Sequence, residues 1–596
     1  MVDFIDQEKE LHLMRTVWPR LCYIKDRFVY MLDHGPLHAD RVKRIATQVS
    51  YLLGLSSLER SLLRAAAIVH DIGMSEGGKN KGDEEIKASH QRWISEILHR
   101  LVDQGCLQLN HTQIDFISKI AEKHSKPYDS TTEPQFSNGT KIRTGLLGAV
   151  LRVADAMDMD QRRTPNFDKQ KSLIEQVCPD QLKYHESANA INGIKIICEG
   201  NFPSVQVFTD NPYLSQLHIS DLLRELGETP LYWPVTVFHL KALKDCQYFR
   251  IPGHIKKALV CAYFNPHSMI MAALSKNNLK RRGIEVEICC NYEETGNLNT
   301  FWNECFPKLR DKKYDLYVFA GLPIQIEDPE RTISELKPLI RDGKEIYYCH
   351  YLEKNFEALQ GFLQNGIKVS LGDSWSAFVA DTPTVEDLYW AKIAALITRD
   401  RSLLPVLKPR EELLLKGLLK VFHEAIQTGS NEEIRKVINR ICDNDIDFFV
   451  TESRCWDDIC KTYLERIQNS LQIKGKTLYI ESAQDIGLKA RTIYPILDEI
   501  MMHYGSVGFE TNITLKYPYI VAKFKRTKEQ IQVLFQSCWR VEGLIPVKFL
   551  CRVGEDVLIP CDHILWISFK SDAEAQKVID ETIDRINSEL SLLNRV

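Results

Sequence analysis

The stretch AAAIVHD, Ala65 to Asp71, ends an apolar helical run with an adjacent histidine and aspartate, and Ile72 and Gly73 follow it. An imidazole nitrogen and a carboxylate therefore leave the backbone at one point, which suits a transition-metal ion. About one His-Asp dipeptide is expected by chance in a chain of this length, so the pair alone is weak evidence. The case for a metal site depends on the residues around it.

Helical spacing of apolar residues surrounds this stretch and predicts an all-α bundle for the first part of the chain. The segment DHGPLH, Asp33 to His38, breaks one helix and starts another, because Gly35 and Pro36 are unfavourable inside a helix. Ser57 is the expected N-cap of the helix that runs to Asp71. Further helices are predicted at Glu8–Leu32, Glu85–Val102, Gln113–Lys123 and Arg143–Met157.

A small β-hairpin is expected to pack on this bundle. Residues Ile191–Phe208 alternate apolar and polar side chains around a turn at Gly200, and no convincing strand is expected before about residue 190. Leu214–Leu226 returns to a helical pattern. The first domain is therefore predicted to span residues 1–250.

The pattern changes near Lys256, where short apolar segments alternate with helical ones. This alternation is typical of a parallel sheet and predicts a Rossmann-like α/β domain over residues 251–405. Because such sheets bind ligands beyond the carboxyl ends of their strands, a second small ligand could contact Asn265, His267, Gly321 and Asp373. The first turn lacks the glycines of a dinucleotide fingerprint, so the alternative is a structural or partner-binding scaffold. The predicted strands are ALVCAYF, IEVEICC, DLYVFAG, EIYYCHY and IKVSLGD.

The last part of the chain, residues 406–596, is predicted to be an α+β region. Glu411–Leu471 has a helical pattern, and a final helix is expected from about Asp572. Between them lie the strand-like segments ITLKY, YIVAKFK, IQVLFQ, VKFLCRV and ILWISFK. This region is a second candidate for binding a protein partner.

Composition favours a cytoplasmic, globular, multidomain protein. The 596 residues are 44% apolar and 26% charged, and the formal charge of -4 provides no global basic field for nucleic acid or membrane. The 16 cysteines are scattered, as is usual for reduced thiols. The acidic first ten residues argue against a secretory signal, and no uncharged apolar run is long enough to span a membrane.

Other candidate metal ligands lie at helix-scale intervals around His70 and Asp71. They are His38, His90, His124 and Asp155. His99 lies nine positions after His90, about half a turn off its helical face, so we expect it outside the site. His12, His111 and His423 are interpreted in the same way, as core or surface residues.

This series of residues, H…HD…H…H…D, resembles the HD superfamily of metal-dependent phosphohydrolases over about residues 30 to 165, with an outer limit near 250. In that family the series spreads over several helices and converges on one or two metals. The resemblance implies that His38, His70, Asp71 and Asp155 form the core metal site. It implies that His90 and His124 are the additional ligands of a two-metal site.

Imidazoles and carboxylates suit Mn, Fe, Ni, Co or Zn better than Mg or Ca, and a carboxylate such as that of Asp71 can bridge two ions. Two ions about 3.5 to 4 Å apart lower the pKa of a water between them toward about 7 and clamp phosphoryl oxygens. The resemblance thus implies hydrolysis by a metal-activated hydroxide, with His70 and Asp71 at its centre.

Four basic residues near the ligands are candidates for substrate phosphate contacts, because guanidinium groups grip phosphate with two hydrogen bonds. They are Arg41, Lys126, Arg162 and Arg163, and the alternative for each is a solvated helix end. His34 is interpreted as a polar residue at a helix start, with a supporting role behind His38 as the alternative.

Departures from named subfamilies narrow the resemblance. The HD-GYP enzymes carry a GYP signature near the second histidine pair, where this chain has KHSKPYD, and usually a lysine shortly after HD, where Met74 follows HDIG. The runs ADAMDMDQRRTP and KYHESANAINGIKI are instead similar to a bacterial group labelled HD-CE, found in conflict-related and chaperone-like contexts. That resemblance does not specify a substrate.

The sequence therefore predicts a bacterial metal-dependent phosphohydrolase or phosphodiesterase. Its expected substrate is a nucleotide, a cyclic or oligo-nucleotide, or a nucleic-acid end, and the downstream domains are expected to sense a ligand or choose a partner. Two alternatives stay open: a regulatory protein that binds metal or nucleotide with little turnover, and a metal-dependent nuclease, which would need a basic groove.

Overall fold

A computed structural model describes much of the chain. The described residues are 5–28, 30–76, 83–125, 135–137, 140–164, 167–199, 202–239, 251–263, 266–291, 306, 314–320, 329–349, 362, 364–371, 387–397, 409–428, 431–468, 470–483, 493–507, 514–515, 517–527, 530–538, 545–551, 557–561 and 564–593.

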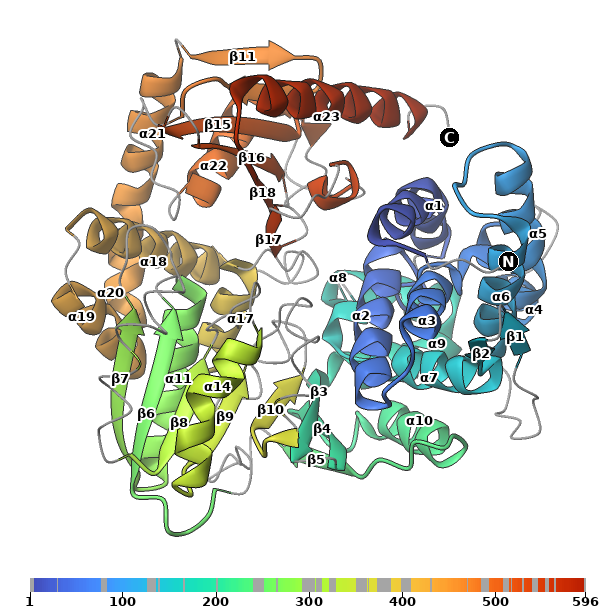
Figure 1. Cartoon of the computed structure of the whole chain (residues 1–596), viewed down its shortest axis with the longest axis horizontal. Coiled ribbons are helices and arrows are strands. Elements are labelled where there is room, and N and C mark those ends of the chain that lie inside the picture. Colours follow the sequence, from blue (N-terminus) through green and yellow to red (C-terminus); the bar gives the residue numbers. More distant parts are fainter. Residues whose placement is uncertain are drawn as a thin grey trace. The chain divides into compact units, whose positions relative to one another are not determined.

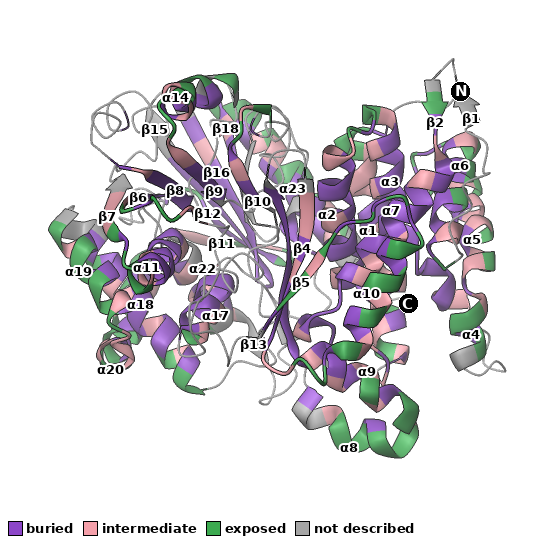
Figure 2. Ribbon diagram, turned by 90° about the horizontal axis from the view of Figure 1, so that it is seen from below, coloured by how far each residue is buried: buried purple, intermediate pink, exposed green. Residues whose placement is uncertain are grey.

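The N-terminal region is helical, as predicted (Figure 1). Its helices are α1 (Gln7–Arg27), α2 (Pro36–Leu52), α3 (Ser57–Val69), η1 (Ile72–Glu76), α4 (Asp83–Ser89), α5 (Gln91–Asp103), α6 (His111–Ala121), η2 (Glu122–Ser125), α7 (Thr144–Met157), η3 (Gln161–Arg163), α8 (Phe167–Val177), α9 (Pro179–Asn189) and α10 (Gln216–Gly227). Helices α3 and α7 are largely buried, whereas α8 is mostly exposed (Figure 2). The buried helices thus form the core that positions the site.

Helix α3 begins with a capping box. The N-cap is Ser56, one residue before the predicted Ser57, and its hydroxyl accepts a hydrogen bond from the backbone N–H of Glu59. The Glu59 side chain accepts in return from the Ser56 backbone N–H and from the guanidinium of Arg143, which precedes α7. The start of α3 is therefore tied to the start of α7, and both helices carry site residues toward their ends.

A mixed sheet of eight strands follows, in the order β5-β4-β3-β10-β9-β8-β6-β7. Its strands are β3 (Ile191–Glu199), β4 (Phe202–Thr209), β5 (Val235–His239), β6 (Lys257–Tyr263), β7 (Glu285–Asn291), β8 (Leu316–Ala320), β9 (Glu345–Cys349) and β10 (Lys368–Leu371). The last five correspond to the five predicted strands and pair in parallel with one another. Helix α11 (Pro266–Arg281) packs on β6, β7 and β8, and α17 (Leu388–Ile397) and α19 (Asn431–Cys442) pack on α11. Helix α14 (Pro329–Arg341) packs on β9.

The predicted hairpin exists as β3 and β4, but it is not an appendage of the bundle. Strand β3 pairs antiparallel with β10, with Ile196 opposite Leu371, so the hairpin extends the α/β sheet. The prediction of a purely parallel central sheet was therefore wrong for this edge. Strand β5, the short hairpin of β1 (Gln135–Ser137) and β2 (Thr140–Ile142), and helices α8 and α9 were not predicted either.

The C-terminal region contains a six-stranded sheet in the order β11-β12-β15-β16-β18-β17. Its strands are β11 (Leu471–Lys474), β12 (Thr477–Ile480), β15 (Tyr519–Thr527), β16 (Gln530–Ser537), β17 (Val557–Cys561) and β18 (Ile564–Phe569). Helix α23 (Asp572–Leu593) contributes Ala575, Ile579 and Ile583 to the same apolar core as these strands. The other elements are α18 (Pro409–Thr428), α20 (Ile446–Glu452), η8 (Ser453–Cys455), α21 (Trp456–Ile467), α22 (Ile493–Gly505), β13 (Ser506–Val507), β14 (Thr514–Leu515) and η9 (Val547–Phe549).

One C-terminal prediction was wrong. The segment VKFLCRV was expected to be a strand, but its first residues form the 3₁₀ turn η9 and continue as the turn that contains Leu550. Val547 and Phe549 are both buried there. Alternating apolar residues can therefore arise from a buried turn as well as from a strand.

Two compact units divide the chain. One contains residues 1–5, 23–407 and 428–445, and the other contains residues 6–22, 408–427 and 446–596. The bundle and the eight-stranded sheet thus share one unit, while most of α1 packs with the C-terminal region, where Trp18 contacts Phe549 at 5.6 Å between ring centroids. Within the described residues, no helix has the length and apolarity needed to cross a membrane.

Candidate metal centre

Five segments of the bundle bring the predicted ligands together. His38 lies in the first turns of α2, while His70 and Asp71 follow the end of α3. His90 is the N-cap of α5, so the single helix predicted over Glu85–Val102 is in fact broken at this ligand. His124 lies in η2 and Asp155 in α7. The ligand atoms form two clusters that could each hold a metal ion: His38 with His70 and Asp155, and Asp71 with His90 and His124.

One half of the centre gathers on Oδ2 of Asp71. The Nε2 atoms of His38 and His70 lie 3.5 and 3.3 Å from this oxygen, and 3.2 Å from each other. Oδ1 of Asp155 lies 3.3 Å from His38 Nε2 and 3.9 Å from His70 Nε2. Atoms that bind one ion at 2.0–2.2 Å lie about 3 to 4 Å apart, so this spacing fits a single metal ion.

The other half gathers on Oδ1 of the same carboxylate. His90 Nε2 lies 3.3 Å and His124 Nε2 4.0 Å from this oxygen, and the two nitrogens are 3.3 Å apart. The two oxygens of Asp71 thus face two separate ligand sets. This is the arrangement that a bridging carboxylate requires.

The four histidines all turn the same ring atom toward the centre. In each ring Nδ1 donates a hydrogen bond to an oxygen that can only accept, which leaves Nε2 as the unprotonated atom of the neutral ring. The acceptors are Oδ2 of Asp158 for His38 at 2.7 Å, and the carbonyl oxygens of Ala67 for His70 at 2.9 Å, of Lys87 for His90 at 2.6 Å and of Ala121 for His124 at 2.5 Å.

Two pairs of Nε2 atoms therefore face each other, at 3.2 and 3.3 Å. Facing lone pairs repel unless a proton or a cation lies between them. Oδ1 of Asp155 is also buried and lies 3.3 Å from Nε2 of His38. The donor set thus fits one or two divalent transition ions, with His38, His70, Asp71 and Asp155 around one and Asp71, His90 and His124 around the other.

The charges of the centre reflect its burial. Burial alone would raise the pKa of Asp71, but His70 and His34 hold it well below its usual range. Burial lowers the pKa of His124 to about 4, and the neighbouring His70 and His90 act in the same direction. At neutral pH the centre therefore offers an ionised carboxylate and a neutral His124 ring, the forms that bind metal.

The pKa of His38 moves the other way. Burial and the nearby Arg163 lower it, but hydrogen bonds to Asp155, Asp158 and Asp71 outweigh both and raise it to about 10. A metal ion that binds here must displace this proton, so metal binding should release protons and weaken in acid.

Two glycines allow the ligand segments to approach closely. A Cβ atom on Gly73, in the HDIG turn, would lie 1.9 Å from the carbonyl oxygen of His90. A Cβ on Gly148, in α7, would lie 2.5 Å from Cβ of Lys123, the residue before His124. Both glycines therefore set the position of the second ligand pair.

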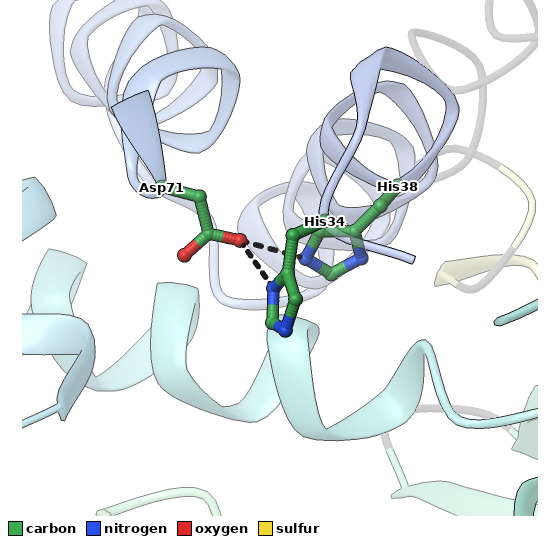
Figure 3. Close-up of side chains that lie close together, drawn as sticks. All are labelled: His34, His38 and Asp71. Atoms are coloured by element: carbon green, nitrogen blue, oxygen red, sulfur yellow. Dashed lines mark hydrogen bonds and ion pairs between the residues drawn. The ribbon is translucent and has the colours of Figure 1, made fainter. Parts of the chain in front are cut away.

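His34 lies in the centre, contrary to its interpretation as a polar residue at a helix start. Its Nδ1 is 2.8 Å from Oδ2 of Asp71, and the two residues group with His38 as a further possible metal cluster (Figure 3). Burial lowers the pKa of His34 to about 4, against the raising effect of Asp71. The prediction was misled by Pro36, which marks the start of a helix. A residue just before a helix can still point its side chain toward the first turn of that helix.

Asp158 also contacts the centre, and the sequence prediction missed it. It accepts a hydrogen bond from His38 Nδ1 and two from Arg41, at 2.7 Å from Nε and 3.1 Å from Nη2. Arg41 also lies 3.5 Å from Asp33. The acidic run ADAMDMD contains Asp158 three residues after Asp155, which was the available signal.

The four residues predicted to bind phosphate have different surroundings in the structure. Arg41 is buried and committed to Asp158, and Arg162 is buried and donates to both carboxylate oxygens of Asp160. Both guanidinium groups are therefore hydrogen-bonded to carboxylates of the protein. Arg163 lies at the centre, with Nη1 3.7 Å from Oδ1 of Asp155, while Lys126 lies outside the described residues.

The expected ligand rim of the α/β sheet is mostly outside the described residues. This holds for Asn265, Gly321 and Asp373, whereas His267 lies in the first turn of α11. Strands β6 and β8 are adjacent and their crossovers run to opposite sides of the order β7-β6-β8-β9-β10. This is the topological switch point at which ligands bind in such sheets, so His267 keeps its place as a candidate.

A protein-family model matches the part of the chain that contains the helical bundle. The family model HD-CE matches residues 26–223. No curated protein matches the sequence. Among solved structures, the exonuclease RecJ bound to manganese is 12% identical with a TM-score of 0.30, covering 56% of this chain and 90% of RecJ.

An exopolyphosphatase-related protein from Bacteroides fragilis is 10% identical with a TM-score of 0.32, covering 57% of this chain and 94% of that protein. TM-scores this low do not establish a shared fold. The family match covers the runs ADAMDMDQRRTP and KYHESANAINGIKI, on which the resemblance to HD-CE is based. It also includes every proposed metal ligand. Residues 26–223 of this chain are thus similar to the HD-CE family.

Proposed function

We propose that the HD-CE domain hydrolyses a phosphate ester or anhydride with the help of one or two divalent transition ions. The observation that carries the proposal is the convergence of four histidine Nε2 atoms on the two oxygens of one buried carboxylate, that of Asp71. Each ring is held in the metal-binding tautomer by an acceptor at Nδ1. A structural core has no need of this combination.

The chain's own residues have distinct parts in this reaction. Asp71 joins the two ligand sets, and Asp158, held by Arg41, orients His38. When bound, divalent ions supply an activated water nucleophile and neutralise charge on the phosphoryl oxygens. The buried walls of the centre exclude bulk water and thereby strengthen these electrostatic effects.

Substrate approach is favoured from the side of Asp155. This side chain is 31% exposed, whereas those of His38, Asp71 and His124 are 0–6% exposed. Arg163 lies beside it and donates to the carbonyl oxygens of Asp33 and Asp158, which hold its guanidinium in place. A phosphate that reaches Asp155 therefore meets a fixed positive charge, and Arg163 is the residue we assign to phosphate binding.

The substrate class remains the one predicted from the resemblance: a nucleotide, a cyclic or oligo-nucleotide, or a nucleic-acid end. The downstream domains are proposed to sense a second ligand or to bind a protein partner. If the C-terminal region is the sensor, a protein of residues 23–445, which retains the bundle and the whole eight-stranded sheet, should hydrolyse substrate without responding to such a ligand.

Metal analysis combined with a substrate panel tests the proposal. Purified protein should carry a transition metal by mass spectrometry and release phosphate from at least one nucleotide or oligonucleotide. Asp71→Asn should abolish both properties, while Asp180→Asn, an exposed carboxylate on α9, should leave both unchanged.

Each result discriminates among the functions. Metal binding without turnover on any substrate would favour a regulatory binding protein, and equal cleavage of long single strands and free nucleotides would favour a nuclease. Absence of metal in the wild type, or an unaltered Asp71→Asn variant, would remove the catalytic proposal.

A further inference from the structure

Four polar residues link helices α5 and α6 on the surface of the bundle, outside the buried centre. They are His99 and Asp103 on α5 and His111 and Asp115 on α6. On each helix the histidine and the carboxylate are four residues apart, so they share one face. We call these four residues the α5–α6 cluster.

The two rings of the α5–α6 cluster meet edge to edge. Their Nδ1 atoms are 2.8 Å apart, their centroids are 5.0 Å apart and their planes differ by 17°, so the two Nδ1 atoms point at each other. On the far side of each ring, Nε2 faces a carboxylate of the other helix. This distance is 3.1 Å from His99 to Asp115 and 3.3 Å from His111 to Asp103. Three polar contacts thus run in series from one carboxylate to the other.

The number of protons decides whether all three contacts can form. Each contact with a carboxylate needs a proton on Nε2, and the contact between the rings needs one proton between the Nδ1 atoms, which makes three. Two neutral rings carry two protons, so one contact must lack its proton. Two fully protonated rings carry four, so two N–H groups would point at each other. One extra proton, shared by the pair, satisfies all three contacts.

The rings are not paired with other charges of the described residues. The ion pairs of His99 and His111 are those with the two carboxylates of the cluster. Helices α3 and α7 pack on the buried residues of α6, whereas His111 and Asp115 are exposed. His124 of η2 faces the buried centre. The other charged residues of η1 and η2, and those beside the cluster on α5 and α6, are Glu76, which pairs with Arg100, and Glu96, Lys119, Glu122 and Lys123.

We propose that one proton shared between His99 and His111 clamps α5 to α6. The negative charges of Asp103 and Asp115 favour the added positive charge, and the short distance between the nitrogens suits a charge-assisted hydrogen bond. Because the proton belongs to the pair, the two rings titrate together and not as separate residues. The clamp is strongest while one extra proton is bound. It weakens when the pH rises enough to remove this proton or falls enough to add another.

The clamp joins the two helices that present the second ligand pair of the buried centre. His90 immediately precedes α5, and His124 follows the end of α6 in η2. Histidine ordinarily titrates near about pH 6.5, so the clamp changes its state close to neutral pH. The packing of α5 on α6 is therefore coupled to pH by a device that lies outside the centre.

Amide hydrogen exchange of the full chain tests the clamp. Wild type and His111→Gln are compared from about pH 4.5 to about pH 8.5 by mass spectrometry of the peptides that contain α5 and α6. Comparison at the same pH removes the effects that both proteins share. We expect the variant to exchange on the order of 2- to 10-fold faster near about pH 6.5, and the difference to become smaller on both sides of this maximum. His99→Gln should give the same profile.

Two outcomes would overturn the shared proton. A difference that keeps growing down to about pH 4.5 would indicate two separate histidine–carboxylate ion pairs, and equal exchange of wild type and variants at every pH would show that the contact stabilises nothing. His503→Gln, an exposed histidine on α22, is the matched control and should leave the exchange of α5 and α6 unchanged. The side chains of His99 and His111 are 29% and 57% exposed, so both substitutions should be tolerated. Because the readout does not use activity, the result is independent of the proposed function.

Discussion

At the scale of single residues, the orientation of each imidazole ring decides what the centre can do. A histidine with a free Nδ1 could turn either nitrogen inward, but Asp158 and three backbone carbonyls leave Nε2 as the inward atom in all four rings. The residues behind the ligands therefore matter nearly as much as the ligands themselves.

Asp158→Asn should weaken metal binding about 10- to 100-fold, because the amide no longer fixes the His38 ring or balances the buried Arg41. Metal titration of the purified protein measures the change. Asp40→Asn is the matched control. Asp40 lies on α2 and, like Asp158, has a buried carboxylate, but it pairs with Lys43 and Arg44. Equal losses in the two variants would argue against an orienting role of Asp158.

Gly73→Ala should separate the HDIG turn from His90, because the new methyl group would overlap the His90 carbonyl oxygen. We expect loss of the second metal equivalent and destabilisation by about 1–3 kcal/mol. Gly227→Ala, where an added Cβ meets nothing within 4 Å, is the control. A Gly73→Ala protein with full metal content would show that the turn can relax without moving His90.

At the scale of elements, the capping box of α3 shows how a local motif is recruited by tertiary structure. Ser56 and Glu59 would cap the helix in isolation, but Glu59 also pairs with Arg143 at 2.7 Å. This pairing and the Ser56 backbone hydrogen bond outweigh burial and lower the pKa of Glu59 from 4.5 to about 2.

Glu59→Gln keeps the capping geometry and removes the charge, so it should destabilise the bundle by about 1–2 kcal/mol at neutral pH. The folded protein holds the pKa of Glu59 below its ordinary value, so the stabilisation is present above pH 4.5 and is lost as pH falls through about 2. The difference between wild type and variant, measured by urea unfolding, should shrink over that interval. If the Arg143→Gln background leaves the effect of Glu59→Gln unaltered, the ion pair is not its source.

Elements with regular periodicity could be predicted from the sequence, and those defined by partners could not. The five parallel strands and α7 follow from apolar runs and helical spacing. The boundary between α4 and α5 leaves no trace in the spacing, because the helical pattern continues through His90 and the backbone angles of His90 are themselves helical, with φ -58° and ψ -31°. The short strand β5 pairs with β4 and depends on that neighbour.

At the scale of the whole molecule, the sequence boundary near residue 250 crosses a continuous sheet. Strand β3 lies inside the HD-CE match, yet it pairs with β10, and Nζ of the buried Lys195 donates to the hydroxyl of Tyr347 in β9 at 2.9 Å. The family match and the folding unit therefore do not have the same limits.

A fragment of residues 23–250 should aggregate or unfold at a lower temperature than a fragment of residues 23–445. The shorter one exposes the edge of β3 and leaves the buried Lys195 without its partner. Light scattering and thermal unfolding compare the two. A monomeric 23–250 fragment with the unfolding midpoint of the longer one would show that the bundle is an independent domain.

The sequence alone determined the helical bundle, the parallel strands and the order of candidate ligands around His70 and Asp71, because periodicity and residue type are local properties. The HD-CE match confirms the family resemblance. Only the tertiary structure placed His34 and Asp158 at the centre and paired Arg41 with Asp158, because those contacts depend on which side chains meet across helices. The joining of β3 to β10 was decided in the same way, since pairing between strands about 170 residues apart leaves no local pattern.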